Sequence, residues 1–160
     1  MRTIRLGRTE LIVTKNAFGA LPIQRLSMDQ AAALLKKAYD LGVRFFDTAH
    51  AYTDSEEKIG LAFENVPRQS VVLATKSGAL DPAVLRKEVE MSLAHMKTDY
   101  IDILQLHNPA FVPQEDHPAY QELLKLKAEG KIRHIGLTNH QLKNAVEAVN
   151  SGLYETIQFP

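Results

Sequence analysis

The sequence predicts an α/β fold built on a parallel sheet, and strand spacing, helix placement and short connections all favour it. Six short apolar segments begin near residues 17, 43, 71, 100, 132 and 156, and each interval between them holds one helical pattern. Strict alternation of strand and helix produces parallel strands covered by helices. Two architectures fit, an open doubly wound sheet and a closed (β/α)8 TIM barrel. No G-x-G-x-x-G follows the first strand, as it often does in dinucleotide-binding open sheets.

The N-terminal part of the chain predicts a hairpin followed by a capped helix. The segment TIRLGRTELIV alternates apolar and polar residues around Gly7, which is typical of a short hairpin. Ser27 can cap the next helix, and Gln30 can complete a capping box with it. This helix should run to about residue 41, because Gly42 supplies a C-terminal stop.

The remaining elements follow in the same order of strand and helix. The helix that begins at Pro82 has Asp81 as its expected N-cap. Its apolar residues fall on one face: Leu85, Val89, Leu93 and Met96. The expected strands cover residues 43–47, 70–76, 100–107, 132–139 and 156–159, and the expected helices cover residues 55–65, 82–97, 118–130 and 141–152.

Composition narrows the class of protein. The 160 residues are 45% hydrophobic and 24% charged, with a formal net charge of +0, which predicts a single domain over residues 1–160. A balanced charge gives no electrostatic reason to expect nucleic acid or an anionic membrane as a partner. The absence of cysteine suits a reducing cytoplasm, and no segment approaches the roughly 20 apolar residues of a membrane span. We therefore expect a cytoplasmic protein.

Polar side chains end five of the six predicted strands. They are Asp47, Lys76, His107, Asn139 and Gln158. Any one of them is weak evidence, because an Asp after a strand is more often a turn former and a Lys there is usually solvated. In a barrel, however, the carboxyl ends of all strands face one mouth, where the chemistry of such folds gathers. The set therefore predicts a site at that mouth, with Tyr52 in the adjoining loop.

An acid, a lysine, a histidine and a tyrosine together suit proton donation to a carbonyl oxygen. The reference pKa of tyrosine is about 10, and a neighbouring ammonium group is expected to lower it. Asp47 would keep Lys76 charged and in place, and His107 could orient a substrate carbonyl. Because no nucleophile is evident, an external hydride donor is the natural complement of this acid.

These residues resemble the aldo-keto reductases, carbonyl reductases that use NADPH and are built on a (β/α)8 barrel. FFDTAHAY matches the family's segment that contains the catalytic Asp and Tyr, here Asp47 and Tyr52. LATKSG and LQLHNP place Lys76 and His107 in the remaining catalytic positions. The resemblance covers essentially the whole chain and implies reduction of an aldehyde or ketone.

The resemblance also implies a set of cofactor contacts. Asn139 and Gln158 match the pair that hydrogen-bonds the nicotinamide carboxamide, and Thr138 stands where serine is common. The full set implied is Gly19, Ala20, Asp47, Thr138, Asn139 and Gln158. NADPH is the implied cofactor, with NADH as the alternative, and no metal site is implied.

Some positions depart from the family pattern or have no role in it. Thr53 follows Tyr52, where the family usually has glycine, which should stiffen the turn. His50 is expected at the pocket wall or exposed, and His95 at the surface, whereas His134 and His140 receive no role. In the long connection 108–120, Phe111 and Val112 are expected to form one pocket wall.

Length is the largest departure. A barrel of this kind takes about 250 residues, so six strands in 160 residues predict the N-terminal portion of a barrel that lacks strands seven and eight. Exposed sheet edges would then favour self-association or pairing with a missing C-terminal half. Catalysis by the 160 residues alone should be impaired, because most contacts to the cofactor phosphates would be absent.

Two other functions compete with that of an active reductase. One is a cofactor-sensing or regulatory subunit of a larger assembly, which the same residues would also permit. The other is a metal-dependent barrel hydrolase, which needs several ligands at the strand ends. The positive charge of Lys76 among those ends disfavours the hydrolase.

Overall fold

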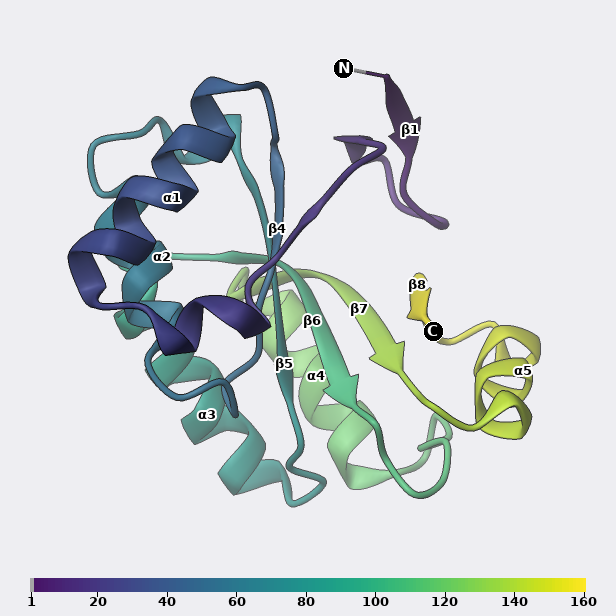
Figure 1. The fold of residues 1–160 in the computed structure, drawn as a ribbon. Helices are drawn as coiled ribbons and strands as arrows, with labels where there is room; N and C mark the ends of the chain where they lie inside the picture. Colours follow the sequence, from purple (N-terminus) through teal and green to yellow (C-terminus); the bar gives the residue numbers. More distant parts are fainter. Residues whose placement is uncertain (1) are drawn as a thin grey trace.

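A computed structural model describes residues 2–160, and its main element is a six-stranded parallel sheet (Figure 1). The strands lie in the order β3-β4-β5-β6-β7-β8, the order of the chain itself. These strands are β3 (Phe18–Gly19), β4 (Phe45–Asp47), β5 (Val72–Ser77), β6 (Ile101–His107), β7 (Ile132–Thr138) and β8 (Thr156–Gln158). A separate antiparallel hairpin joins β1 (Thr3–Arg5) to β2 (Ile12–Thr14).

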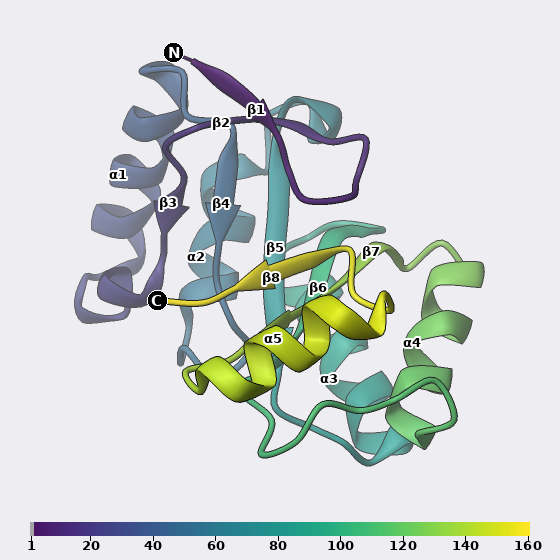
Figure 2. The ribbon, with the colours of Figure 1, turned by 90° about the vertical axis from the view of Figure 1, so that its right-hand side faces the viewer.

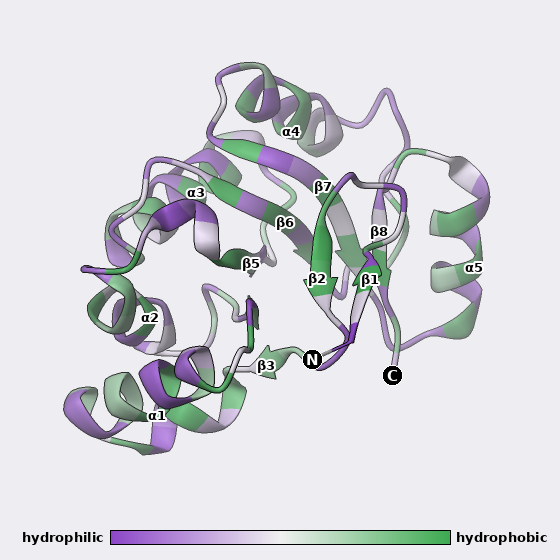
Figure 3. Cartoon of the chain, turned by 90° about the horizontal axis from the view of Figure 1, so that it is seen from above, coloured by the Kyte–Doolittle hydropathy of each residue, from purple (hydrophilic) through white to green (hydrophobic). Residues whose placement is uncertain are grey.

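Helices connect the parallel strands and lie on the outer side of the curled sheet, as Figures 2 and 3 show. They are α1 (Met28–Asp40), α2 (Ser55–Phe63), α3 (Pro82–His95), α4 (Pro118–Ala128) and α5 (Leu142–Ser151). Two short 3-10 helices, Leu21–Arg25 and Arg68–Ser70, were not anticipated. The arrangement is part of a (β/α)8 barrel, which confirms the predicted fold class. In residues 2–160, no helix is long and apolar enough to cross a membrane.

Local sequence signals explain where several helices begin. Ser27 and Gln30 form the expected capping box at the start of α1. The Asp81 carboxylate accepts hydrogen bonds from the backbone N–H groups of Ala83 and Val84 at the start of α3. Such caps satisfy the first N–H groups of a helix and stabilise it by about 1 kcal/mol each.

Alternation along the strands divides the core into two layers. Phe46, Leu73 and Leu104 point outward and form a large buried cluster with the helices. Ala74 and Ile103 point inward, where they pack with Leu11, Val13 and other residues of the hairpin. Because neighbouring strand residues face opposite sides, polar residues in phase with Ala74 and Ile103 reach the interior of the barrel.

The hairpin is fixed against the end of the barrel near β8. The backbone N–H of Arg8 donates to the Glu155 carbonyl oxygen at 2.9 Å. Gly7 has a φ of 52°, and a Cβ there would lie 2.3 Å from the same oxygen. Only glycine permits both this left-handed conformation and this close approach. The hairpin expected from the sequence is therefore confirmed, and it covers the inner layer of the core.

Candidate active site

The carboxyl ends of β4 and β5 place an acid and a lysine in direct contact. The Lys76 ammonium donates to Asp47 Oδ1 at 2.5 Å and to the Thr48 carbonyl oxygen at 2.6 Å. The Lys76 side chain is only 3% exposed. A buried ammonium needs such partners, because an uncompensated charge there would be very costly. The pairing of Asp47 and Lys76 predicted from the strand ends is thus present.

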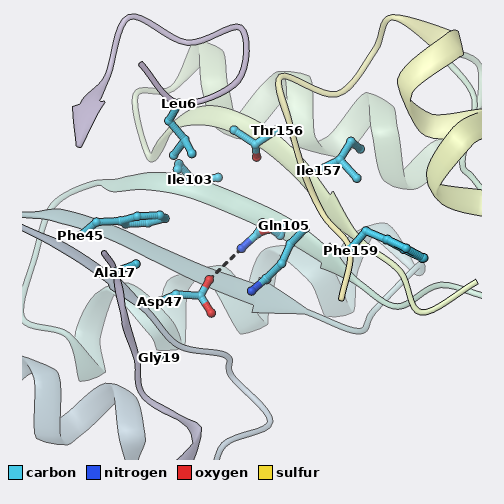
Figure 4. Close-up of a pocket in the computed structure, with 11 residues that line it drawn as sticks. Leu6, Ala17, Gly19, Phe45, Asp47, Ile103, Gln105, Thr156, Ile157 and Phe159 are labelled. Atoms are coloured by element: carbon cyan, nitrogen blue, oxygen red, sulfur yellow. Dashed lines mark hydrogen bonds between the residues drawn. The ribbon is translucent and has the colours of Figure 1, made fainter. Parts of the chain in front are cut away.

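Gln105 on β6 also binds the Asp47 carboxylate, a contact that the sequence did not predict. Its side-chain Nε2 donates to Asp47 Oδ2 at 3.0 Å, as the dashed line in Figure 4 marks. Gln105 lies two residues before His107, so strand alternation turns both side chains inward. A polar residue within the apolar run IDILQLH was the available signal. Both oxygens of Asp47 therefore have donors.

The loop after β4 positions Tyr52 through backbone hydrogen bonds to β5 and to itself. His50 N–H donates to the Lys76 carbonyl oxygen at 3.0 Å, and Tyr52 N–H donates to the Ala49 carbonyl oxygen at 3.0 Å. Thr53 has a φ of 45°, in the left-handed region that favours glycine. The glycine that the family usually has here is thus explained by backbone geometry, and Thr53 carries some strain.

Tyr52 lies beside both Lys76 and His107. The Lys76 Nζ is 5.3 Å from the centroid of the Tyr52 ring, and the Tyr52 and His107 rings meet edge to face at 5.7 Å. Burial, and then the negative charge of Asp47, raise the pKa of Tyr52 above its usual value. The expected lowering by Lys76 is therefore wrong for the resting site, where burial and the Asp47 charge determine the direction of the shift. Tyr52 stays protonated at neutral pH.

His107 is half-buried at the end of β6 and is electrically neutral near pH 7. Burial, and then the positive charge of Lys76, lower the pKa of its imidazole, although Asp47 partly opposes them. The imidazolium form would place a second cation beside Lys76 in a partly desolvated site. A neutral ring can donate one hydrogen bond from one nitrogen and accept one at the other.

A cavity of about 220 Å³ lies over these side chains. Its lining residues come from four strand ends and the adjoining loops: Tyr52, Lys76, His107, Thr138, Asn139, His140, Gln158, Phe159 and Pro160. His140, which received no role from the sequence, is one of them. The structure therefore brings Tyr52, Lys76 and His107 to one opening.

The two amide residues expected to bind cofactor differ in their surroundings. Asn139 is buried; its Nδ2 donates to the Pro109 carbonyl oxygen at 2.8 Å, and its Oδ1 accepts from Gln141 N–H at 2.9 Å. Each of these side-chain atoms keeps one unused hydrogen-bonding position. Gln158 is exposed at the end of β8 and lines the cavity. Gln158 is thus the freer of the two.

A second cavity, of about 390 Å³, occupies the barrel interior between β3 and β8 (Figure 4). Gly19, Asp47, Gln105 and Gln158 give it a polar end. Leu6, Phe45 and Ile103 give it an apolar floor. Ala20, a further cofactor residue implied by the family, is buried and lines neither cavity, although its N–H donates to the Asp47 carbonyl oxygen at 2.8 Å. The polar end of this cavity therefore lies beside the ion pair of Asp47 and Lys76.

Other residues lie differently from their predicted places. Phe111 packs on His117, and Val112 is buried in the core, so neither lines the two cavities at the strand ends. His95 is partly exposed at the end of α3, but its ring stacks parallel to that of His50 and lies near Glu56. This association depends on how α2 and α3 pack, which the sequence pattern does not specify.

Comparison with known proteins identifies the relatives of this chain. A model of the aldo/keto reductase family matches residues 14–157. L-galactose dehydrogenase of Arabidopsis thaliana is 37% identical over 152 residues, and the match covers 83% of this chain and 47% of that protein. An NADH-specific methylglyoxal reductase of Escherichia coli is 30% identical, with 99% of this chain and 58% of that protein covered.

Solved structures match equally well. An aldo-keto reductase from Bacillus halodurans in its holo form superposes with a TM-score of 0.87 at 27% identity, over 99% of this chain and 57% of that one. An aldo-keto reductase from Klebsiella pneumoniae in complex with NADPH gives 0.83 at 28% identity, over 98% and 57%. The chain spans about half the length of the curated relatives that it matches.

Proposed function

Because the chain belongs to the aldo/keto reductase family, we propose that the protein reduces aldehydes or ketones to alcohols with NADPH as the hydride source. Tyr52 is the proton donor, Lys76 its electrostatic partner, Asp47 the anchor of Lys76, and His107 the group that orients the substrate carbonyl. The observation that carries this proposal is a protonated Tyr52 beside an ammonium group held by two acceptors.

The raised pKa of Tyr52 favours this role in the reducing direction. A general acid must hold its proton at the working pH, and Tyr52 does so. As the proton moves to the carbonyl oxygen, negative charge develops on the phenol oxygen. The Lys76 ammonium can stabilise that charge as it forms, an interaction stronger in the transition state than in the ground state. Lys76 therefore acts during proton transfer.

His107 supports the same step from a position beside Tyr52. Its neutral imidazole can donate a hydrogen bond to the carbonyl oxygen without competing with Tyr52 as a stronger acid. The edge-to-face contact between the two rings keeps the donors close. Two donors directed at one oxygen orient the substrate and polarise its carbonyl.

The residues at the strand ends fit a nicotinamide cofactor. When bound, the reduced nicotinamide ring supplies the hydride that adds to the carbonyl carbon. Gln158 offers a free amide to its carboxamide group, with Thr138 and the unused positions of Asn139 beside it. Gly19 exposes backbone at the entrance of the interior cavity. We propose NADPH rather than NADH, with NADH as the alternative that a direct comparison of the two would identify.

We further propose that efficient catalysis needs more sheet than the six strands β3–β8. Strands β3 and β8 end the sheet and pair with one neighbour each. Such edges associate with other strands, either of a second copy or of a C-terminal half. The 160 residues alone should therefore bind NADPH far more weakly than a complete reductase. Solution mass and an NADPH fluorescence titration measure this, and a stable monomer with full affinity would contradict it.

Conversion of Tyr52 to Phe tests the proposed chemistry. In a complete reductase that contains these residues, it removes the acidic proton and should lower the rate of carbonyl reduction about 10²- to 10⁴-fold, with cofactor binding nearly unchanged. Tyr100→Phe is the matched control, because that ring lies on Arg68, away from the cavity. Normal turnover by Tyr52→Phe would show that the roles are wrong. NADPH binding without turnover by the complete, unaltered protein would instead favour a cofactor-sensing subunit.

A further inference from the structure

We propose that His50, Glu56 and His95 form a binding site for a divalent ion of the zinc class. The site lies on the outer side of the loop that carries Tyr52. His50 belongs to that loop, Glu56 to the first turn of α2, and His95 to the end of α3. The ion is not a participant in carbonyl reduction, because the proposed site faces the helices and not the barrel interior.

Both separations from the Glu56 carboxylate match a metal site. Glu56 Oε2 lies 3.4 Å from His50 Nδ1 and 3.5 Å from His95 Nδ1, and one ligand atom from each of the three residues lies within 4.8 Å of the other two. Zinc bonds to nitrogen or oxygen of about 2.0–2.2 Å place tetrahedral ligands roughly 3.3–3.6 Å apart. The contact between His50 and Glu56 is a long hydrogen bond, since such bonds are usually about 2.9 Å. The two imidazole rings are nearly parallel, so they would have to turn toward an ion between these atoms.

Glu56 is held in the orientation that a ligand needs. Its side chain is 3% exposed, and its second oxygen, Oε1, accepts a hydrogen bond from Thr75 Oγ1 at 2.6 Å. This leaves Oε2 directed at the two imidazoles. The second nitrogen of His95 lies 3.6 Å from a Glu57 carboxylate oxygen. Carboxylates and hydroxyls behind first ligands fix their orientation and strengthen metal binding.

The donor set selects the class of ion. Two imidazole nitrogens and one carboxylate oxygen suit zinc and similar transition metals, whereas calcium and magnesium prefer oxygen ligands. The His50 and His95 side chains are 21% and 31% exposed, so an ion can reach them from solvent. Three protein ligands leave a tetrahedral ion one position for water.

Strand β5 connects this site to the proposed catalytic residues. Thr75, which holds Glu56, directly precedes Lys76, and His50 N–H donates to the Lys76 carbonyl oxygen. An ion that joins His50 to α3 would restrain the loop two residues before Tyr52. We therefore expect bound zinc to stabilise the loop that carries Tyr52. Hydrogen exchange of the backbone N–H groups in this loop should then be slower.

Zinc titration of the tag-free, metal-stripped protein by isothermal calorimetry tests the site. The unaltered protein should bind one zinc ion, and cobalt in its place should give the visible absorption of a tetrahedral complex. His95→Asn removes a ligand and should weaken zinc binding at least about 100-fold, because even the groups behind ligands contribute about 10- to 100-fold. His117→Asn is the matched control, since that histidine caps α4 and asparagine is also a good cap.

His50→Asn is the second variant, in case His95→Asn does not fold, because His50 is partly exposed and its hydrogen bond to β5 is made by its backbone. It should also weaken binding at least about 100-fold. The proposal is overturned if the unaltered protein shows no saturable zinc binding, or if His50→Asn binds as tightly as the unaltered protein. It is also overturned if His117→Asn loses as much affinity as the ligand variants. Because every readout is a binding measurement, failure of carbonyl reduction would leave this test intact.

Discussion

Substitution of Gly60 by alanine should separate two helices that touch through their backbones. Gly60 lies in α2, and a Cβ built on it would be 2.2 Å from the His95 carbonyl oxygen and 3.1 Å from Met96 Cα. Real Cβ contacts are essentially never shorter than 3.0 Å. Because both neighbours are backbone atoms at the end of α3, no side-chain rotation can relieve the overlap. One helix must move away from the other.

The magnitude follows from two opposing effects. Overpacking costs about 1–3 kcal/mol, and a backbone overlap of this size belongs near the upper end of that range. Alanine gains about 1 kcal/mol over glycine from its helix propensity. The net loss of unfolding free energy should be about 2 kcal/mol, which corresponds to a fall in melting temperature of roughly 4–8 °C for a domain of this size.

Urea unfolding followed by circular dichroism measures this loss. Gly78→Ala is the matched control, because a Cβ on Gly78 meets nothing within 4 Å, and its stability should change by at most about 0.5 kcal/mol. A Gly60→Ala midpoint equal to or above that of the unaltered protein would refute the packing argument. The same variant should also bind zinc more weakly, because displacement of α3 moves His95 away from Glu56.

Three further substitutions test the site and its surroundings. Gln105→Leu removes a hydrogen bond to the Asp47 carboxylate that is worth about 1.5–3 kcal/mol. In the complete protein, kcat/KM should therefore fall roughly 10- to 100-fold in steady-state assays, and unchanged kinetics would contradict this. Thr53→Gly relieves a left-handed conformation that costs about 1–2 kcal/mol, but the greater conformational entropy of glycine in the unfolded chain costs about 0.5–1 kcal/mol. A slight gain in the urea midpoint is therefore expected, and a large loss would contradict this. Burial raises the pKa of Tyr154 in the folded state. The protonated phenol therefore stabilises the folded state fully below about pH 10, and this contribution is lost as the pH rises further. Tyr154→Phe should therefore show a flatter decline of urea midpoint above that pH, and an equal decline would count against it.

The fold could be predicted from the sequence because its signals are local. Caps such as Ser27 and Asp81 and the period of the apolar residues determine where helices begin and which face is buried. The order of strands then follows from alternation alone. The 3-10 helices Leu21–Arg25 and Arg68–Ser70 could not be predicted, because such short turns have no periodic pattern.

Part of the site could be predicted from one rule, that side chains at the carboxyl ends of the strands point into the barrel mouth. That rule selected Asp47, Lys76 and His107, which the structure brings together with Tyr52. It did not select Gln105, which lies deeper in its strand. The direction of the Tyr52 pKa shift is not the predicted one, because it depends first on the burial of the phenol and then on the nearby Asp47 charge.

Polar side chains on the two faces of β5 hold the loop after β4 in place. On the inner face, Lys76 binds Asp47 and the Thr48 carbonyl oxygen, which secures the start of the loop. On the outer face, Thr75 holds Glu56, which secures the start of the following helix and faces His50. Adjacent residues of one strand thus restrain both ends of the segment that carries the proposed proton donor. Zinc at the outer face should therefore slow hydrogen exchange in the loop without replacing any group that acts at the inner face.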